Sequence, residues 1–136
     1  MTRYHFSLAI TILFFLGKAA TILLAVELMN AAVYQPKELV ELGTIITPLF
    51  SAYLTIMMKQ IFLATDQDHA THMNAAQIFL GFAVPVLEIA FIMGCLLYKR
   101  DHMAGLDVVK YGLGATESLF GVYLGIIVSA VFKPSA

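Results

Sequence analysis

The apolar positions of the chain fall into four long runs, which are separated by short polar breaks. A helix needs about 20 mainly apolar residues to cross the hydrocarbon core of a bilayer, and each run reaches that length. The runs predict transmembrane helices at about residues 5–29, 39–64, 75–98 and 108–132. The sequence therefore predicts an all-α integral membrane protein, with a single four-helix domain over residues 1–136 and no soluble domain.

The connections between the predicted helices are short. Helices joined by short connections usually pack side by side in opposite directions. We therefore expect an antiparallel, up-and-down bundle in which consecutive helices form hairpins. Tyrosines lie near the ends of the runs, where amphipathic rings favour the headgroup level of a bilayer. These tyrosines are Tyr4, Tyr34, Tyr98 and Tyr111.

The composition supports a membrane location. Of the 136 residues, 60% are hydrophobic and 12% are charged, against about 45–50% and 25% in soluble domains. A net charge of −1 provides no basic surface for phosphates, so we expect no nucleic-acid partner. The single cysteine, Cys95, excludes an intrachain disulfide. We expect a multi-pass protein of a bacterial-type inner membrane or a plasma membrane, with the lipid bilayer as its surroundings.

The orientation in the membrane stays open, because the basic residues are almost evenly divided between the two sides. One side carries Arg3, Lys59 and Lys133. The other side carries Lys37, Lys99, Arg100 and Lys110.

Small and hydroxyl residues recur at helical spacing along the predicted spans. In the second span the stripe consists of Thr44, Thr47, Ser51 and Thr55. In the fourth span Gly121, Gly125 and Ser129 follow Glu117 at every fourth position, and Gly81 lies in the third span. Such stripes are typical of close packing between membrane helices, and hydroxyls can also bond carbonyls of their own helix. Alternatively, the stripes line a polar pathway.

Two prolines lie near the middles of predicted spans, Pro48 in the second and Pro85 in the third. Each removes a backbone donor and can free a carbonyl for a polar partner.

Three ionisable residues lie inside the predicted spans: Lys18, Glu88 and Glu117. A charged residue at the centre of a membrane helix costs about 2.5–3.5 kcal/mol on insertion scales, so such residues are functional candidates. Lys18 and Glu88 lie at similar depth in two spans that run in the same direction, so we expect an ion pair, which could be a purely structural tie.

The sequence shows no cation at the depth of Glu117, although Lys110 or a neighbouring subunit could supply one. A carboxyl that changes its protonation inside a membrane suits a proton relay or a cation site. The alternative is a protonated glutamate that is hydrogen-bonded across a helix interface.

The segment Glu117-Ser118-Leu119-Phe120-Gly121-Val122-Tyr123 resembles the carboxylate-bearing helix of proton-driven rotor rings. The glycine-dense helices that line such rings are missing here, so we do not extend the resemblance to function.

A metal or cofactor has weak support in the sequence. Asp68, His69 and His72 could meet at one edge of the second connection and hold a divalent ion, but these are also ordinary residues of a solvated loop. The chain contains no pair of mid-membrane histidines for haem and no glycine-rich phosphate motif, so we expect no cofactor.

Together these features favour a homo-oligomer that forms an ion- or proton-conducting channel or transport pathway, with the second and fourth spans as lining or interface helices. The alternative is a membrane-embedded interaction or sensor subunit of a defence, signalling or respiratory complex, which contacts a protein partner through its short loops. A membrane enzyme acting on a lipid-soluble substrate is the least favoured class, because the sequence shows no nucleophile–base or metal constellation at a common depth.

Overall fold

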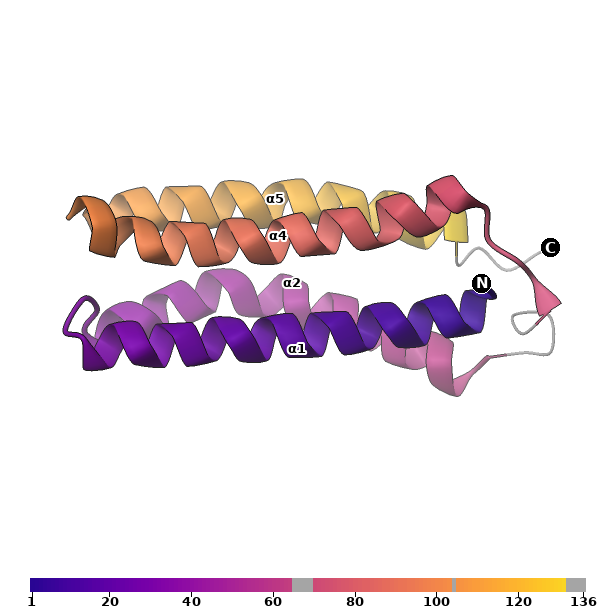
Figure 1. Cartoon of the computed structure of the whole chain (residues 1–136), viewed down its shortest axis with the longest axis horizontal. Helices are drawn as coiled ribbons and strands as arrows, with labels where there is room; N and C mark the ends of the chain where they lie inside the picture. The colour runs from indigo at the N-terminus through magenta and orange to yellow at the C-terminus, as the bar shows by residue number, and fades with distance from the viewer. Residues whose placement is uncertain (65–69, 104, 132–136) are drawn as a thin grey trace.

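The computed structural model describes residues 1–64, 70–103 and 105–131, without the side chains of Leu49, Gln60, Leu124 and residues 127–131. In this part of the chain it contains four long helices, which run in alternating directions along one axis (Figure 1). They are α1 (Arg3–Asn30), α2 (Pro36–Phe62), α4 (Ala75–His102) and α5 (Leu106–Val131). The all-helical, four-helix prediction is confirmed, and α4 extends beyond the predicted span to His102.

The helices begin where the sequence offers side-chain caps. Asn74 and Gln77 form a capping box at the start of α4, with the Gln77 N–H donating to Asn74 Oδ1 over 2.8 Å. At the start of α2 the Gln35 N–H donates to Glu38 Oε2 over 2.7 Å, and Pro36 fills the first helical position, where no N–H is needed. These local signals fix the α2 and α4 boundaries within the apolar pattern.

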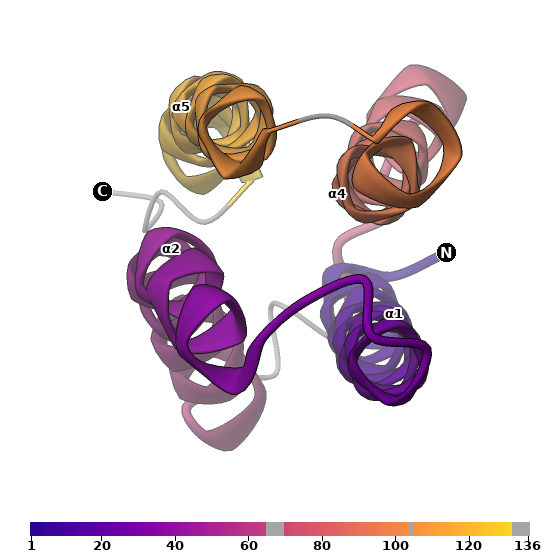
Figure 2. The ribbon, with the colours of Figure 1, turned by 90° about the vertical axis from the view of Figure 1, so that its left-hand side faces the viewer.

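The lateral arrangement differs from a simple series of hairpins. Helix α1 packs against α2 and α4, and α5 packs against α4 and α2. Seen end-on, α2 and α4 therefore lie on a diagonal of the bundle, although they are consecutive in the chain (Figure 2). The expectation that every consecutive pair forms a hairpin is wrong for this pair.

Backbone pairing at the N-terminus explains the diagonal connection. The Arg3 N–H donates to the Thr71 carbonyl over 3.1 Å, and the Met73 N–H donates to the Met1 carbonyl over 3.0 Å. These bonds hold the beginning of α4 beside the beginning of α1, so the two helices run parallel.

Two glycines allow α1 and α4 to approach closely. A Cβ at Gly17 would lie 2.1 Å from Ile89 Cδ1, and a Cβ at Gly81 would lie 2.2 Å from Phe6 Cζ. Both distances are far below van der Waals contact, so a larger residue at either position would have to displace the side chain of Ile89 or Phe6. Each helix thus contributes one glycine to the shared interface.

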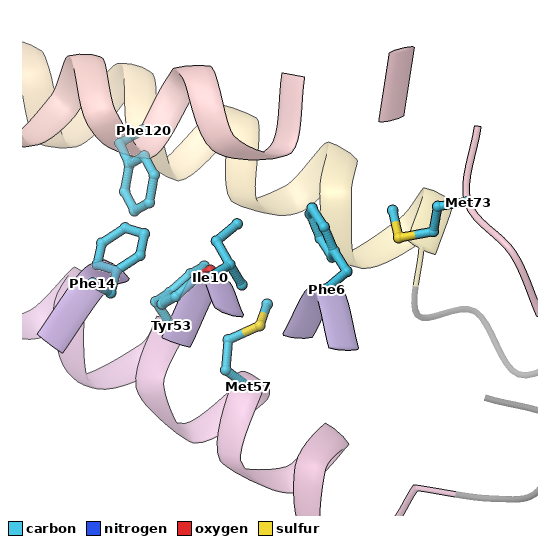
Figure 3. Close-up of a cluster of buried hydrophobic side chains, with 7 residues drawn as sticks. All are labelled: Phe6, Ile10, Phe14, Tyr53, Met57, Met73 and Phe120. Carbon is cyan, nitrogen blue, oxygen red and sulfur yellow. The ribbon is translucent and has the colours of Figure 1, made fainter. Parts of the chain in front are cut away.

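Among the described residues, the interior contains two apolar clusters, one towards each end of the bundle. The N-terminal cluster, drawn in Figure 3, consists of Phe6, Ile10, Phe14, Tyr53, Met57, Met73 and Phe120. The opposite cluster consists of Leu28, Tyr34, Leu42, Ile92, Leu96, Val109 and Leu113.

Polar side chains are buried beside the apolar clusters, and many large apolar side chains are exposed. The buried polar side chains are Ser7, Thr11, Lys18, Thr21, Glu88 and Glu117. Large apolar side chains are exposed on the outer faces of all four helices, among them Leu16, Leu23, Val40, Phe79, Phe91 and Leu119. Helices α1, α2 and α4 are long and apolar enough to cross a membrane.

Candidate functional site

Three helices bring their single interior charges to one place. The Lys18 Nζ of α1 lies 2.8 Å from Glu88 Oε1 of α4 and 3.8 Å from Glu117 Oε1 of α5. The three residues are only 7%, 4% and 8% exposed, respectively. We call this group the ionic centre. The structure thus brings together the expected Lys18–Glu88 pair, and it adds Glu117 as a third member.

The α1–α4 interface places the first two members. Gly17 immediately precedes Lys18, and the side chain that fills the space above Gly17 belongs to Ile89, the residue after Glu88. Close approach at this point therefore sets the ammonium beside the Glu88 carboxylate.

Glu117 does not stand alone, in contrast to the sequence expectation that its depth holds no cation of this chain. Lys18 supplies the ammonium, and Lys110 instead pairs with Glu41 at the end of the bundle. The long lysine stem lets one nitrogen reach carboxyls on two helices. Because the ammonium already lies within the bundle, no neighbouring subunit is needed to supply it.

The ionic centre has two carboxyl groups for one ammonium. Buried charges are stable only when they are paired and hydrogen-bonded, and two carboxylates in one buried site do not both ionise readily. The neutral arrangement is Lys18 as ammonium, one glutamate ionised and the other protonated. A neutral centre would therefore carry one proton on either Glu88 or Glu117.

The carboxyl oxygens of the centre are short of hydrogen-bond donors. Among the described residues, no donor reaches Glu88 Oε2 or either oxygen of Glu117, although all three atoms are buried. Both carboxyl groups lie beside the same Lys18 ammonium. A proton on one of them would provide a donor for the other.

Helix α2 adds aromatic groups around the centre. The Phe50 ring centroid lies 5.8 Å from Lys18 Nζ. Next to it, Tyr53 packs on Phe14 and Phe120, with ring centroids 4.1 Å and 5.9 Å apart. Phe14 and Phe120 are each about one turn from a charged member of the centre. An aromatic layer therefore covers the centre on its N-terminal side.

A proline-dependent contact joins α4 to α5 beyond this layer. Pro85 has no N–H to donate to the carbonyl of Gly81, one turn earlier in α4. The Tyr123 hydroxyl of α5 donates to that carbonyl over 3.1 Å. The expected freeing of a carbonyl by Pro85 thus has a specific polar partner in the structure.

The hydroxyl stripe of α2 lies outside the bundle. All four of its residues, Thr44, Thr47, Ser51 and Thr55, are exposed. Three of their hydroxyls donate to carbonyls of the same helix: Thr44 to Glu41, Thr47 to Gly43 and Thr55 to Ser51. Thr44, Ser51 and Thr55 therefore do not line the space around the ionic centre, whereas Thr47 lines a groove between α1 and α2 that also reaches Lys18.

The small residues of α5 are also peripheral in the described part. Gly121 is half-buried, and Gly125 is exposed with no other side chain near the position of a Cβ. The side chain of Ser129 lies outside the described residues.

The possible metal site is not assembled in the part that the structure describes. Asp68 and His69 lie outside the described residues, and His72 is exposed in the backbone pairing with Thr2. Among the described residues, no group of three or more His, Cys, Asp or Glu side chains could hold a metal ion.

Sequence reasoning missed a second set of ion pairs, at the end of the bundle that carries the 31–35 turn. Lys99 Nζ lies 2.7 Å and 2.8 Å from the two oxygens of Glu38, and Lys110 Nζ lies 2.5 Å from Glu41 Oε2. They join α2 to α4 and α5. The sequence could have indicated these pairs, because it places two acidic residues, Glu38 and Glu41, and two basic residues, Lys99 and Lys110, at the same predicted end of the bundle.

Tyr34 supports this end of the bundle from the turn. Its hydroxyl donates to the Leu96 carbonyl over 2.9 Å, and Lys99 Nζ lies 4.4 Å from its ring centroid. Burial, followed by the nearby Glu38 carboxylate, raises the pKa of Tyr34 to about 12. The tyrosine therefore remains a neutral donor at physiological pH.

The fold and the site define an all-α bundle with an apolar exterior, three helices able to cross a membrane and a buried ionic centre. No family model, curated protein or solved structure matches this chain.

Proposed function

We propose that the protein is a multi-pass membrane protein in which all four helices cross the bilayer. Two features support this proposal: interior positions hold Lys18, Glu88 and Glu117, and large apolar side chains cover the outside. Such an exterior would be unfavourable in water and matches a hydrocarbon surrounding.

Its proposed activity is the transfer of protons across the membrane through the ionic centre. The observation that carries the proposal is the pairing of two buried carboxyls with one ammonium. A centre that is neutral with one shared proton can release and rebind that proton with a small rearrangement. Charged residues at the middle of membrane helices are typical members of proton pathways.

The proposed assembly is a homo-oligomer. The outward stripe of Thr44, Thr47, Ser51 and Thr55 supports it, because small hydroxyl residues allow membrane helices to pack closely. Each protomer would carry its own ionic centre, and copies would meet along α2.

Reconstitution into liposomes tests the activity. The purified protein is inserted into vesicles that contain a pH-sensitive dye, and a potassium gradient with valinomycin drives proton entry. We expect a proton flux above that of empty vesicles, and Glu117→Gln should reduce it at least tenfold. This substitution leaves the closer Lys18–Glu88 pair in place, so the bundle should still fold.

Glu41→Gln is the matched control, since Glu41 also pairs with a lysine but lies at the exposed end of the bundle. Its flux should equal that of the wild type. A wild-type flux no greater than that of empty vesicles, or an unchanged flux in Glu117→Gln, contradicts the proposal.

A second candidate function is a membrane-embedded interaction subunit, and the same exposed α2 stripe favours it. In that case the hydroxyl face would pack against a different membrane protein. Mass measurement of the complex in detergent separates the two possibilities: copies of this chain alone support the homo-oligomer, and a defined second polypeptide supports the interaction subunit.

A further inference from the structure

A groove of about 310 Å³ runs along the interface of α1 and α2 and reaches Lys18 of the ionic centre, while Glu88 and Glu117 are not among its lining residues. Lys18 and Phe50 line its inner end, and Val26 and Leu39 line its outer end. Leu39 lies within about one turn of the first residue of α2. The groove therefore extends from the middle of the bundle almost to the 31–35 turn.

Helix geometry gives the length of this path. From Phe50 to Leu39 the rise along α2 is about 16 Å, at 1.5 Å per residue. That distance is about half the thickness of a hydrocarbon core. The groove thus covers the depth between the ionic centre and one membrane surface.

Polar atoms occur along the groove, although most of its wall is apolar. An ammonium has three N–H donors, and Lys18 Nζ makes one short hydrogen bond, to Glu88. Thr21 and Thr47 donate to the carbonyls of Gly17 and Gly43, and their oxygens remain able to accept. Donors at the inner end and acceptors along the wall suit water, and the volume corresponds to about ten molecules at 30 Å³ each.

The opposite side of the ionic centre is closed. Phe14, Tyr53 and Phe120 form the aromatic layer there, and each is at most 2% exposed. Further apolar residues of the N-terminal cluster fill the space behind this layer. On this side the described aromatic side chains cover the centre.

We propose that the α1–α2 groove is a water-filled half-channel that connects the ionic centre with the aqueous phase at the 31–35 turn. This inference rests on the proposed proton transfer and adds its direction of access. Protons would exchange between the centre and that side through the groove, and transfer to the other side would require a rearrangement of the aromatic layer.

The α4–α5 interface provides a matched control. It carries a larger groove, of about 570 Å³, lined by Leu87, Gly94, Cys95, Tyr98 and Gly112 among others. None of the described residues that line it is charged, and no member of the ionic centre is among them. Gly43 and Gly94 lie in the two grooves at similar distances from the same end of the bundle, and a Cβ at either position meets no neighbour within 4 Å.

Cysteine labelling in proteoliposomes tests water access without relying on transport. In a Cys95→Ala background, Gly43→Cys and Gly94→Cys are exposed to a charged, membrane-impermeant methanethiosulfonate reagent. We expect Gly43→Cys to react at least tenfold faster than Gly94→Cys. Equally slow reaction would mean that lipid acyl chains fill both grooves, and it would overturn the half-channel.

Filling the groove tests its contribution to proton flux. Gly43→Leu should reduce the flux at least tenfold, whereas Gly94→Leu should leave it at the wild-type value. A wild-type protein without flux but with fast labelling of Gly43→Cys would reject the proposed activity and retain the water-filled groove. A normal flux in Gly43→Leu would reject the groove as the access path.

Discussion

The ionic centre and the ion pairs at the 31–35 end contain the same kinds of residue in different ratios. At the end, Glu38 pairs with Lys99 and Glu41 with Lys110, one carboxylate for each ammonium, and these side chains are 16% to 39% exposed. In the centre, two carboxyls share Lys18, and none of the three side chains exceeds 8% exposure. Charge is balanced where the side chains are partly exposed and unbalanced where they are buried.

The two groups of charges are therefore expected to contribute differently to stability and to the proposed proton transfer. Exposed ion pairs usually contribute at most about 1 kcal/mol, so the end pairs serve mainly to orient the helix termini. Buried charges are unfavourable unless they are fully paired, so a second carboxyl next to an existing pair is not needed to hold the helices together. Glu117 is therefore the member of the centre to which the proposed proton transfer assigns a role.

The largest expected effect comes from removing the shared ammonium. Lys18→Met leaves two buried carboxyls without a counter-charge, and loss of one partner of a buried pair destabilises a protein by about 3–5 kcal/mol. Thermal unfolding in detergent should therefore show a large fall in the midpoint. An unchanged midpoint would contradict the buried location of the charges.

A double-mutant cycle sharpens this test. If Lys18 and Glu88 interact as the structure shows, Lys18→Met combined with Glu88→Leu should be less destabilised than the sum of the two single variants. Additive effects would mean that the two side chains do not meet.

The four helices and one pair of the ionic centre could be predicted from the sequence, whereas the third member of the centre could not. Apolar run length predicted the four helices, because a continuous run of that length leaves little choice of structure. Counting residues from the start of each predicted span placed Lys18 and Glu88 at similar depth in the membrane, since their helices run in the same direction. It missed the contact with Glu117, because counting places Cα atoms and ignores the reach of a lysine side chain.

The neighbours of each helix could not be predicted from the pattern. Short connections favoured hairpins throughout, but the backbone bonds between residues 1–3 and 71–73 align α4 with α1 instead. Hydroxyl spacing likewise could not tell an inner face from an outer one: Thr44, Thr47 and Thr55 satisfy their hydroxyls within α2 and lie outside.

A smaller effect is expected from crowding the interface that aligns the centre. Gly81→Ala places a Cβ 2.2 Å from the Phe6 ring, and overpacking of this kind costs about 1–3 kcal/mol. Gly43→Ala is the control, because its Cβ meets no neighbour. The unfolding midpoint in detergent should fall for Gly81→Ala only, and equal midpoints would contradict the close α1–α4 contact.

At the paired end, Tyr34→Phe should have a modest effect that depends on pH. Loss of the hydrogen bond to the Leu96 carbonyl should destabilise the protein by about 1 kcal/mol at pH 7. The raised pKa of about 12 favours the neutral phenol in the folded state, so this contribution is present below pH 10 and is lost as the pH rises from 10 towards 12.

Unfolding of both proteins at pH 7 and pH 11 measures this change. The difference in midpoint between wild type and Tyr34→Phe should shrink at the higher pH. A difference that stays constant would mean that the Tyr34 hydroxyl is not buried against α4.

The smallest effect is expected for Glu41→Gln, and it decides whether the two regions really differ. Glu41 and Lys110 are in contact, yet their side chains are 39% and 32% exposed, so water can solvate Lys110 once its partner is gone. The unfolding midpoint of Glu41→Gln should match that of the wild type at moderate salt. A fall as large as that of Lys18→Met would show that the end pairs also stabilise the bundle. The charge imbalance of the ionic centre would then no longer support the function proposed for it.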